Sequence, residues 1–201
     1  MPSTSYIEVV TKASNLSEVA RQALERTPIM ASVILSTLNK CVALDMADQS
    51  PLGHWWIVIY SGPKVALVLS CTDGYMGKYP IFIVDTNVMD DKDFIPSIQL
   101  LAHTLQRHVP IERVYSVYGP IEIAQLFSKI WTQLTGVQPE PQPYYDAKIS
   151  WLRYEDLQQS VTDSEGSKFE VGLAGPTDIG AIAKLCYSFA SDSVSPRFLS
   201  I

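Results

Sequence analysis

Two apolar runs separated by a four-residue turn occupy residues 54–71, written HWWIVIYSGPKVALVLSC. Each run is rich in Val, Ile, Leu or Trp, which suits a strand buried in a sheet. Gly62 and Pro63 lie between the runs, and both residue types favour a turn. The stretch therefore predicts a β-hairpin, and its polar interruption makes it unsuitable as a membrane span. Trp55 and Trp56 are neighbours on a strand, so one is expected in the core and the other facing a second layer.

The rest of the chain alternates between helical and extended patterns. Residues 15–26, 28–44, 90–108, 120–136 and 176–192 show helical spacing or helix boundary signals. Short apolar or β-branched segments predict strands at residues 81–85, 111–118, 147–154 and 169–175, with an initial strand or arm in 1–13 and a loop at 71–80. Such alternation predicts an α/β layered domain.

Local capping signals support several of these boundaries. Thr27 is a good N-cap, and Pro28 suits the first helical position. Ser17 fits a glycosylation sequon with Asn15, but a helix-cap role is favoured because no secretory signal precedes it. Gly136 is a good stop for the helix at 120–136.

Composition excludes some classes of protein. The 201 residues are 47% apolar and 18% charged, which supports a sizeable core and argues against disorder. The net charge of −6 and the absence of a Lys/Arg run argue against nucleic-acid binding. The three cysteines are far apart and form no C-x-x-C pair, so no metal site is expected. With no signal peptide in the first residues, the chain is predicted to be a cytoplasmic protein with reduced, mostly buried thiols.

A polar linker suggests a division of the chain. We expect a first lobe over residues 1–157, a linker over 158–168 and a strand-helix extension over 169–201. A single strand-helix pair cannot bury its own faces as an independent domain. The extension must therefore pack on the first lobe or open a second domain.

Four segments, YPIFIV, YGPIEIAQLFSKIWTQLTG, ISWLRYEDL and FEVGLAGPTDIGAIAKLCYSFASDS, carry a family resemblance. In their order the chain resembles two-lobe GCN5-related N-acetyltransferases over roughly residues 60–195. The resemblance implies an acyl-CoA N-acyltransferase fold, a mixed sheet flanked by helices, with residues 1–157 as a degenerate lobe. Residues 169–201 then resemble the first strand and helix of a truncated catalytic lobe.

The resemblance also implies acetyl-CoA as the cofactor and acetyl transfer to an amine as the reaction. In that family a strand, the motif Arg/Gln-x-x-Gly-x-Gly/Ala and a helix hold the pyrophosphate, and the motif does not occur in this sequence. By resemblance its counterpart is the turn after residue 118, which makes Gly119, Pro120 and Ile121 the candidate cofactor-binding residues. This turn has one glycine, and Pro120 removes a donor N–H. A purely structural turn, with Pro120 at the first helical position, is therefore favoured.

Other candidate chemistry is weaker. His54, His103 and His108 are scattered, which favours packing or surface roles over ligation or catalysis. The acidic stretch DTNVMDDKD lacks the glycine and glutamate of a calcium loop and predicts a helix start instead. Cys71 lies between a strand and a Gly-containing loop and could be accessible, without a recognisable nucleophile motif. None of the ten tyrosines can be assigned as a general acid.

Three functions remain open. The first is an N-acetyltransferase-related protein that is catalytically incomplete. The second is a non-catalytic interaction or dimerisation module, whose partner would be a second copy or a C-terminal lobe rather than nucleic acid or membrane. An exposed apolar face would favour such association, and the expected residues are Ile179, Ile182, Leu185 and Phe189. The third is a shortened product whose function belongs to a longer form.

Overall fold

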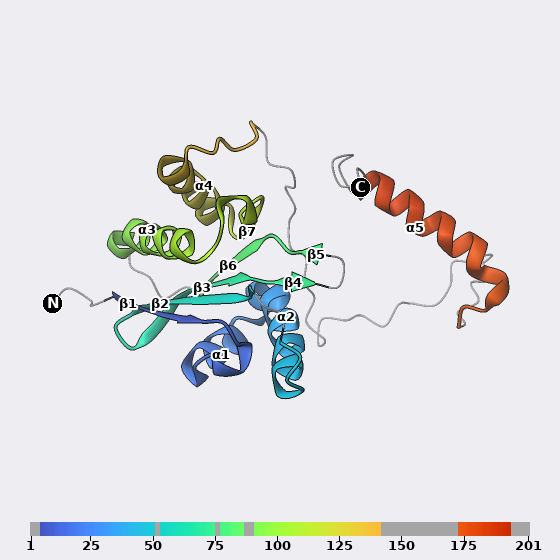
Figure 1. Ribbon diagram of the computed structural model, residues 1–201, viewed down its shortest axis with the longest axis horizontal. Coiled ribbons are helices and arrows are strands. Elements are labelled where there is room, and N and C mark those ends of the chain that lie inside the picture. The colour runs from blue at the N-terminus through green and yellow to red at the C-terminus, as the bar shows by residue number, and fades with distance from the viewer. Residues whose placement is uncertain (1–4, 51–52, 75–76, 87–90, 142–172, 194–201) are drawn as a thin grey trace, which may run out of the picture. The chain divides into compact units, whose positions relative to one another are not determined.

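The computed structural model describes residues 5–50, 53–74, 77–86, 91–141 and 173–193. The chain divides into two compact units, Met1–Trp151 and Leu152–Ile201. The first unit contains a sheet with helices on both faces (Figure 1). In the second unit the described elements are one 3-10 turn and one helix. The expected linker at 158–168 and the expected strand at 147–154 lie outside the described residues.

Five strands form the main sheet, in the order β1-β2-β3-β6-β7. Their bounds are β1 Ser5–Val10, β2 Trp55–Ser61, β3 Lys64–Cys71, β6 Ile81–Asp85 and β7 Val117–Tyr118. Neighbours are antiparallel from β1 to β6, whereas β6 and β7 are parallel. A parallel pair requires a crossover, and α3 (Asp91–His108) lies within it. The prediction of an α/β domain with a mixed, helix-flanked sheet is confirmed.

The hairpin predicted from residues 54–71 is formed by β2 and β3. Gly62 has a φ of 58°, which glycine adopts without steric cost in the turn between the strands. The two tryptophans separate as expected. Trp56 is fully buried on one face of the sheet. Trp55 is partly buried on the other face, and its ring contacts that of His108 in a tilted arrangement, with 4.5 Å between the ring centroids.

Two helix pairs cover opposite faces of the sheet (Figure 1). One face is covered by α1 (Glu18–Arg26) and α2 (Pro28–Met46), the other by α3 and α4 (Ile121–Thr135). The first core includes Ala20, Leu24, Ile34, Leu38 and Trp56. The second includes Ile98, Leu101, Leu105, Ile123 and Phe127. Burial of each large apolar side chain contributes about 1.5–3 kcal/mol, so both helix pairs are firmly attached.

The helix boundaries follow the predicted signals closely. Ser17 is the N-cap of α1, and its Oγ accepts a hydrogen bond from the Ala20 N–H at 3.2 Å. Thr27 and Pro28 begin α2 as predicted, although the Thr27 side chain makes no capping bond. Gly136 ends α4 with a left-handed φ of 78°.

Two predicted segments differ from the structure. The strand predicted over 111–118 forms only at its end, as the two-residue β7; its start is a 3-10 turn, η2 (Ile111–Arg113). Arg113, the last residue of this turn, is buried and donates hydrogen bonds to the carbonyls of Thr72 and Tyr79, which lie outside the strand. The loop expected at 71–80 contains a small antiparallel pair, β4 (Asp73–Gly74) with β5 (Gly77–Lys78).

Among the described residues, α2 is long and apolar enough to cross a membrane by length and composition alone. It also packs against the sheet through buried Ala31, Ile34 and Leu38. A core helix of a globular domain passes the same length and composition test.

The second unit shows η4 (Pro176–Asp178) followed by α5 (Ile179–Ser193). The Gly175 N–H donates to the Asp178 carboxylate at 2.8 Å, which closes the turn before the helix. Residues 173–175 form no strand, and the rest of the strand expected at 169–175 lies outside the described residues. Ile179, Ile182 and Leu185 are exposed, as expected for the apolar face; the Phe189 side chain is not among those described.

Candidate functional site

The predicted site lies where β7 passes into α4. Because β6 and β7 are parallel, their carboxyl ends lie at the same edge of the sheet, where ligands of open α/β sheets usually bind. Ile81 pairs with Val117 and Phe82 with Tyr118, and the pairing ends there. Gly119 follows immediately.

Gly119 packs directly against β6. A Cβ at this position would lie 2.7 Å from the Ile83 carbonyl oxygen and 3.5 Å from the Ile83 Cβ. The first distance is far below a van der Waals contact, so only glycine fits without a shift of backbone. The glycine is therefore explained by the contact between two strands, and no ligand is needed to account for it.

Pro120 and Ile121 leave the turn poorly equipped to bind an anion. Pro120 is predicted at the first helical position of α4. In the structure it is the N-cap, the residue before the first helical residue, and its side chain makes no capping bond. It has no N–H, while its carbonyl accepts from the Ala124 N–H at 2.9 Å. Ile121 is 63% exposed, and Glu122 places a carboxylate in the first turn. That charge opposes the attraction between a helix N-terminus and a phosphate.

A cluster of polar side chains around Arg113 lies at the amino end of β6. The sequence analysis did not predict this cluster. Arg113 is buried and donates hydrogen bonds to the carbonyls of Tyr79 at 2.9 Å and Thr72 at 2.7 Å. It also forms an ion pair with Asp73 at 3.2 Å. Arg113 therefore fixes the β4–β5 segment to the chain that leads into β7. The available signal was a single arginine, Arg113, within the segment IERVYSVY that precedes the turn.

His54 joins the same group and carries a fixed proton. The Asp73 N–H donates to His54 Nε2 at 3.0 Å, so the proton of the neutral ring is on Nδ1. Nδ1 lies 3.7 Å from Cys41 Sγ and donates towards the sulfur. Burial lowers the pKa of His54, against the opposing charges of Asp73 and Asp45, and Arg113 lowers it further.

This Cys41–His54 pair is not an activated nucleophile. Burial raises the pKa of the Cys41 thiol, and the Asp45 charge adds to that effect. A catalytic pair needs an imidazole nitrogen free to take the thiol proton, whereas here Nδ1 already carries one. Both groups are neutral at pH 7, and their role is to fill and satisfy the core between α2 and the start of β2.

The remaining candidates are dispersed. Cys71 is fully buried, so the expectation that it could be accessible is wrong; β3 continues to this residue and places it in the core. His103 is exposed on α3, and the ring of His108, at the end of that helix, contacts the ring of Trp55. Within the part of the chain that the structure describes, no three His, Cys, Asp or Glu side chains gather as a metal site.

Comparison with known proteins identifies no relative. No protein-family model matches the chain, and no curated protein or solved structure shows significant similarity to it.

Proposed function

We propose that the chain is an N-acetyltransferase-related protein that is catalytically incomplete, with residues 1–157 as its degenerate lobe. Such enzymes transfer an acetyl group from acetyl-CoA to an amine. In this proposal the lobe keeps their framework of sheet and helices but does not hold the acyl donor itself.

The framework supports the first half of the proposal. Strands β1, β2, β3 and β6 are antiparallel neighbours, β7 is parallel to β6, and a helix follows each of β6 and β7. Two of the segments that carry the resemblance, YPIFIV and YGPIEIAQLFSKIWTQLTG, fall on β6 and on the turn from β7 into α4.

The contact between Gly119 and Ile83 supports the second part of the proposal, that the lobe does not hold the acyl donor. The resemblance implies a wedge between splayed strands where the thioester and the amine meet. Here the backbone at Gly119 remains in close contact with β6 up to the turn. Pro120 supplies no donor, and Glu122 opposes an anion. A diphosphate would therefore find too few donors at this edge.

Ligand-dependent stability tests the proposal. A ligand at a hundred times its Kd stabilises the folded state by about 2.7 kcal/mol. We expect no rise in the melting temperature with millimolar acetyl-CoA or coenzyme A, and no acetyl transfer to a mixture of primary amines. A saturable rise that is lost in the Gly119→Ala variant would instead identify a working cofactor site at this turn.

A second candidate function is self-association through α5. Ile179 and Leu185 are 65% and 70% exposed, and large exposed apolar side chains favour protein contacts. Sedimentation over a range of concentrations tests this candidate. We expect a dimer that Leu185→Glu weakens and that Lys184→Glu, a change at an exposed neighbour, leaves intact. A concentration-independent monomer would exclude it.

A further inference from the structure

The buried imidazole of His54 connects three separate segments of the first unit. The residue precedes β2 and is only 3% exposed. Its Nε2 accepts a hydrogen bond of 3.0 Å from the Asp73 N–H at the start of β4, and its Nδ1 lies 3.7 Å from Cys41 Sγ on α2. None of these residues belongs to the turn at Gly119, so the behaviour of this ring does not depend on the proposed function.

The hydrogen bond between His54 and Asp73 exists only while the ring is neutral. A backbone N–H can only donate, so Nε2 must carry no proton in order to accept from Asp73. Protonation of the ring places an N–H on Nε2 that points at the Asp73 N–H. Two donors form no hydrogen bond, and the ring and the Asp73 amide must then separate.

Arg113 anchors the residues on either side of the β4–β5 pair through bonds that do not depend on pH. Its guanidinium stays charged in proteins and donates to the carbonyls of Thr72 at 2.7 Å and Tyr79 at 2.9 Å. The Tyr79 N–H also donates to the Thr72 carbonyl at 3.1 Å. Thr72 and Tyr79 therefore stay joined when the His54 bond is lost.

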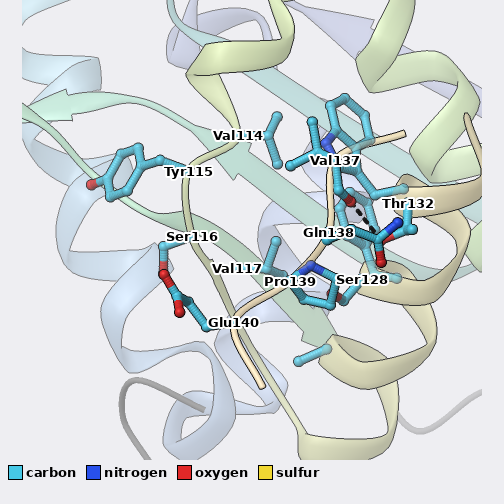
Figure 2. A pocket seen from close by; sticks show the side chains of 13 residues that line it. Val114, Tyr115, Ser116, Val117, Ser128, Thr132, Val137, Gln138, Pro139 and Glu140 are labelled. Atoms are coloured by element: carbon cyan, nitrogen blue, oxygen red, sulfur yellow. Dashed lines mark hydrogen bonds between the residues drawn. The ribbon is translucent and has the colours of Figure 1, made fainter. Parts of the chain in front are cut away.

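Strand β5 has an attachment of its own. The Tyr115 hydroxyl donates to the Lys78 carbonyl at 2.5 Å, and partial burial raises the pKa of Tyr115, so the hydroxyl stays protonated in acid. Figure 2 shows that the Tyr115 side chain points away from Thr132 and Val137, on the other side of its chain segment. Of the two short strands, β4 is therefore the one whose attachment titrates.

The charges that act on His54 come from three elements. Burial is the largest influence and lowers the pKa of the ring; Asp73 on β4 and Asp45 on α2 favour the charged ring, and Arg113 on η2 opposes it. The Cys41 thiol adds no charge, because burial raises its pKa. The ring is therefore neutral at pH 7 and becomes charged below its ordinary pKa of 6.5.

We propose that protonation of His54 releases β4 from the core and makes the β4–β5 segment a pH-sensitive element of the first unit. The charged ring needs an acceptor for its new Nε2–H. The Asp73 carboxylate belongs to the same residue, is 39% exposed and pairs with Arg113 at 3.2 Å. A rotation of β4 exchanges the Asp73 N–H for this carboxylate as the partner of the ring. Acid thus changes one local contact before it unfolds the sheet.

Nuclear magnetic resonance of the full ¹⁵N-labelled chain tests the proposal between about pH 7.5 and pH 5, the range over which histidine titrates. At the upper end, a scalar coupling across the hydrogen bond should join the Asp73 nitrogen to His54 Nε2. We expect this coupling to vanish, and the hydrogen-exchange protection factor of the Asp73 amide to fall about tenfold, with the midpoint of the His54 ring signals. The protection factor of Tyr79 should fall by less, and the amides of β2 and β3 should keep their native chemical shifts.

Three variants identify the groups involved. His54→Gln introduces a neutral side chain whose carbonyl oxygen accepts from an N–H at any pH, so the Asp73 amide should stay protected throughout. His103→Gln is the matched control, an exposed histidine on α3, and should show the release with an unchanged midpoint. Asp73→Asn removes the charge that favours the protonated ring and should move the midpoint to lower pH.

Four outcomes would overturn the proposal. The first is an Asp73 amide that keeps its coupling and protection after the His54 signals show protonation. The second is loss of the native β2 and β3 shifts at the same midpoint, which would mean global unfolding. The others are equal loss of protection in His54→Gln and the unmodified chain, and an Asp73→Asn midpoint that does not fall. Since the first two are measured on the unmodified chain, the test holds even if a variant fails to fold.

Discussion

The guanidinium of Arg113 donates a hydrogen bond of 2.7 Å to the carbonyl of Thr72, 41 residues earlier in the chain. The same side chain reaches the Tyr79 carbonyl and the Asp73 carboxylate. One residue of η2 thereby joins the end of β3 to the chain that enters β7. At the edge of the sheet, these bonds supplement the two paired residues of β7.

Replacement of Arg113 by alanine should therefore destabilise the first unit. The partly buried Tyr79 carbonyl would lose its donor, at about 1–3 kcal/mol for an unsatisfied group, and the buried Thr72 carbonyl would keep only the bond from the Tyr79 N–H. The ion pair adds little, because the Asp73 side chain is 39% exposed. We expect a loss of about 2–4 kcal/mol in the free energy of unfolding, measured by urea denaturation. Arg107→Ala, an exposed change at the end of α3, should cost no more than about 1 kcal/mol.

Much of the fold could be predicted because the signals are local. The hairpin at residues 54–71 and the helix stop at Gly136 each depend on residues adjacent in the chain. The strand predicted over 111–118 did not form in full because the contacts of that segment are with residues distant in the chain. Arg113 is held by residues 34 and 41 positions away, and no periodicity within the segment reports those bonds.

The sequence alone identifies the turn at Gly119 as a candidate site, but it does not reveal which contacts the residues of that turn make. The turn at Gly119 was identified from its glycine and proline. Its contact with the Ile83 carbonyl depends on the pairing of β6 with β7 and could not be anticipated. The Cys41–His54 contact was missed for a similar reason, since the two residues come from a helix and from the residue before a strand.

His54 predicts a pH dependence of stability. Its folded-state pKa lies below the ordinary value of 6.5, because burial disfavours the charged ring. The native state then binds fewer protons than the unfolded chain just below that value. The contribution of His54 to the free energy of unfolding is therefore complete above about pH 6.5 and is lost as the pH falls towards the folded-state pKa. Urea denaturation between pH 7.5 and 5 (roughly the range over which histidine titrates) should show this decline.

Two histidine variants distinguish the source of that decline. His54→Gln removes the titrating group and should flatten the curve in this range, at the expense of lower stability at pH 7. His103→Gln, an exposed change on α3, should retain the full decline. An unchanged slope in His54→Gln would assign the pH dependence to other groups.

The two N-caps at the start of α1 and α2 should differ in their contribution to stability. Ser17 Oγ accepts from the Ala20 N–H and also contacts the Tyr60 hydroxyl at 2.7 Å. Thr27 makes no capping bond, and its hydroxyl donates back to the Ala23 carbonyl. Ser17→Ala is expected to cost about 1–2 kcal/mol and Thr27→Ala less, both measured by thermal and urea denaturation. Equal losses would contradict the assignment of the cap.

The three thiols should react to different extents in the native protein. Cys41 and Cys71 are buried, and burial raises the pKa of both, so neither is a ready thiolate. Cys186 is exposed on α5. Because thiol reagents attack through an accessible thiolate, dithionitrobenzoate should label about one thiol per native chain and all three in denaturant. Cys186→Ser should abolish the rapid native reaction, and mass spectrometry that found Cys71 labelled under native conditions would show that β3 does not bury it.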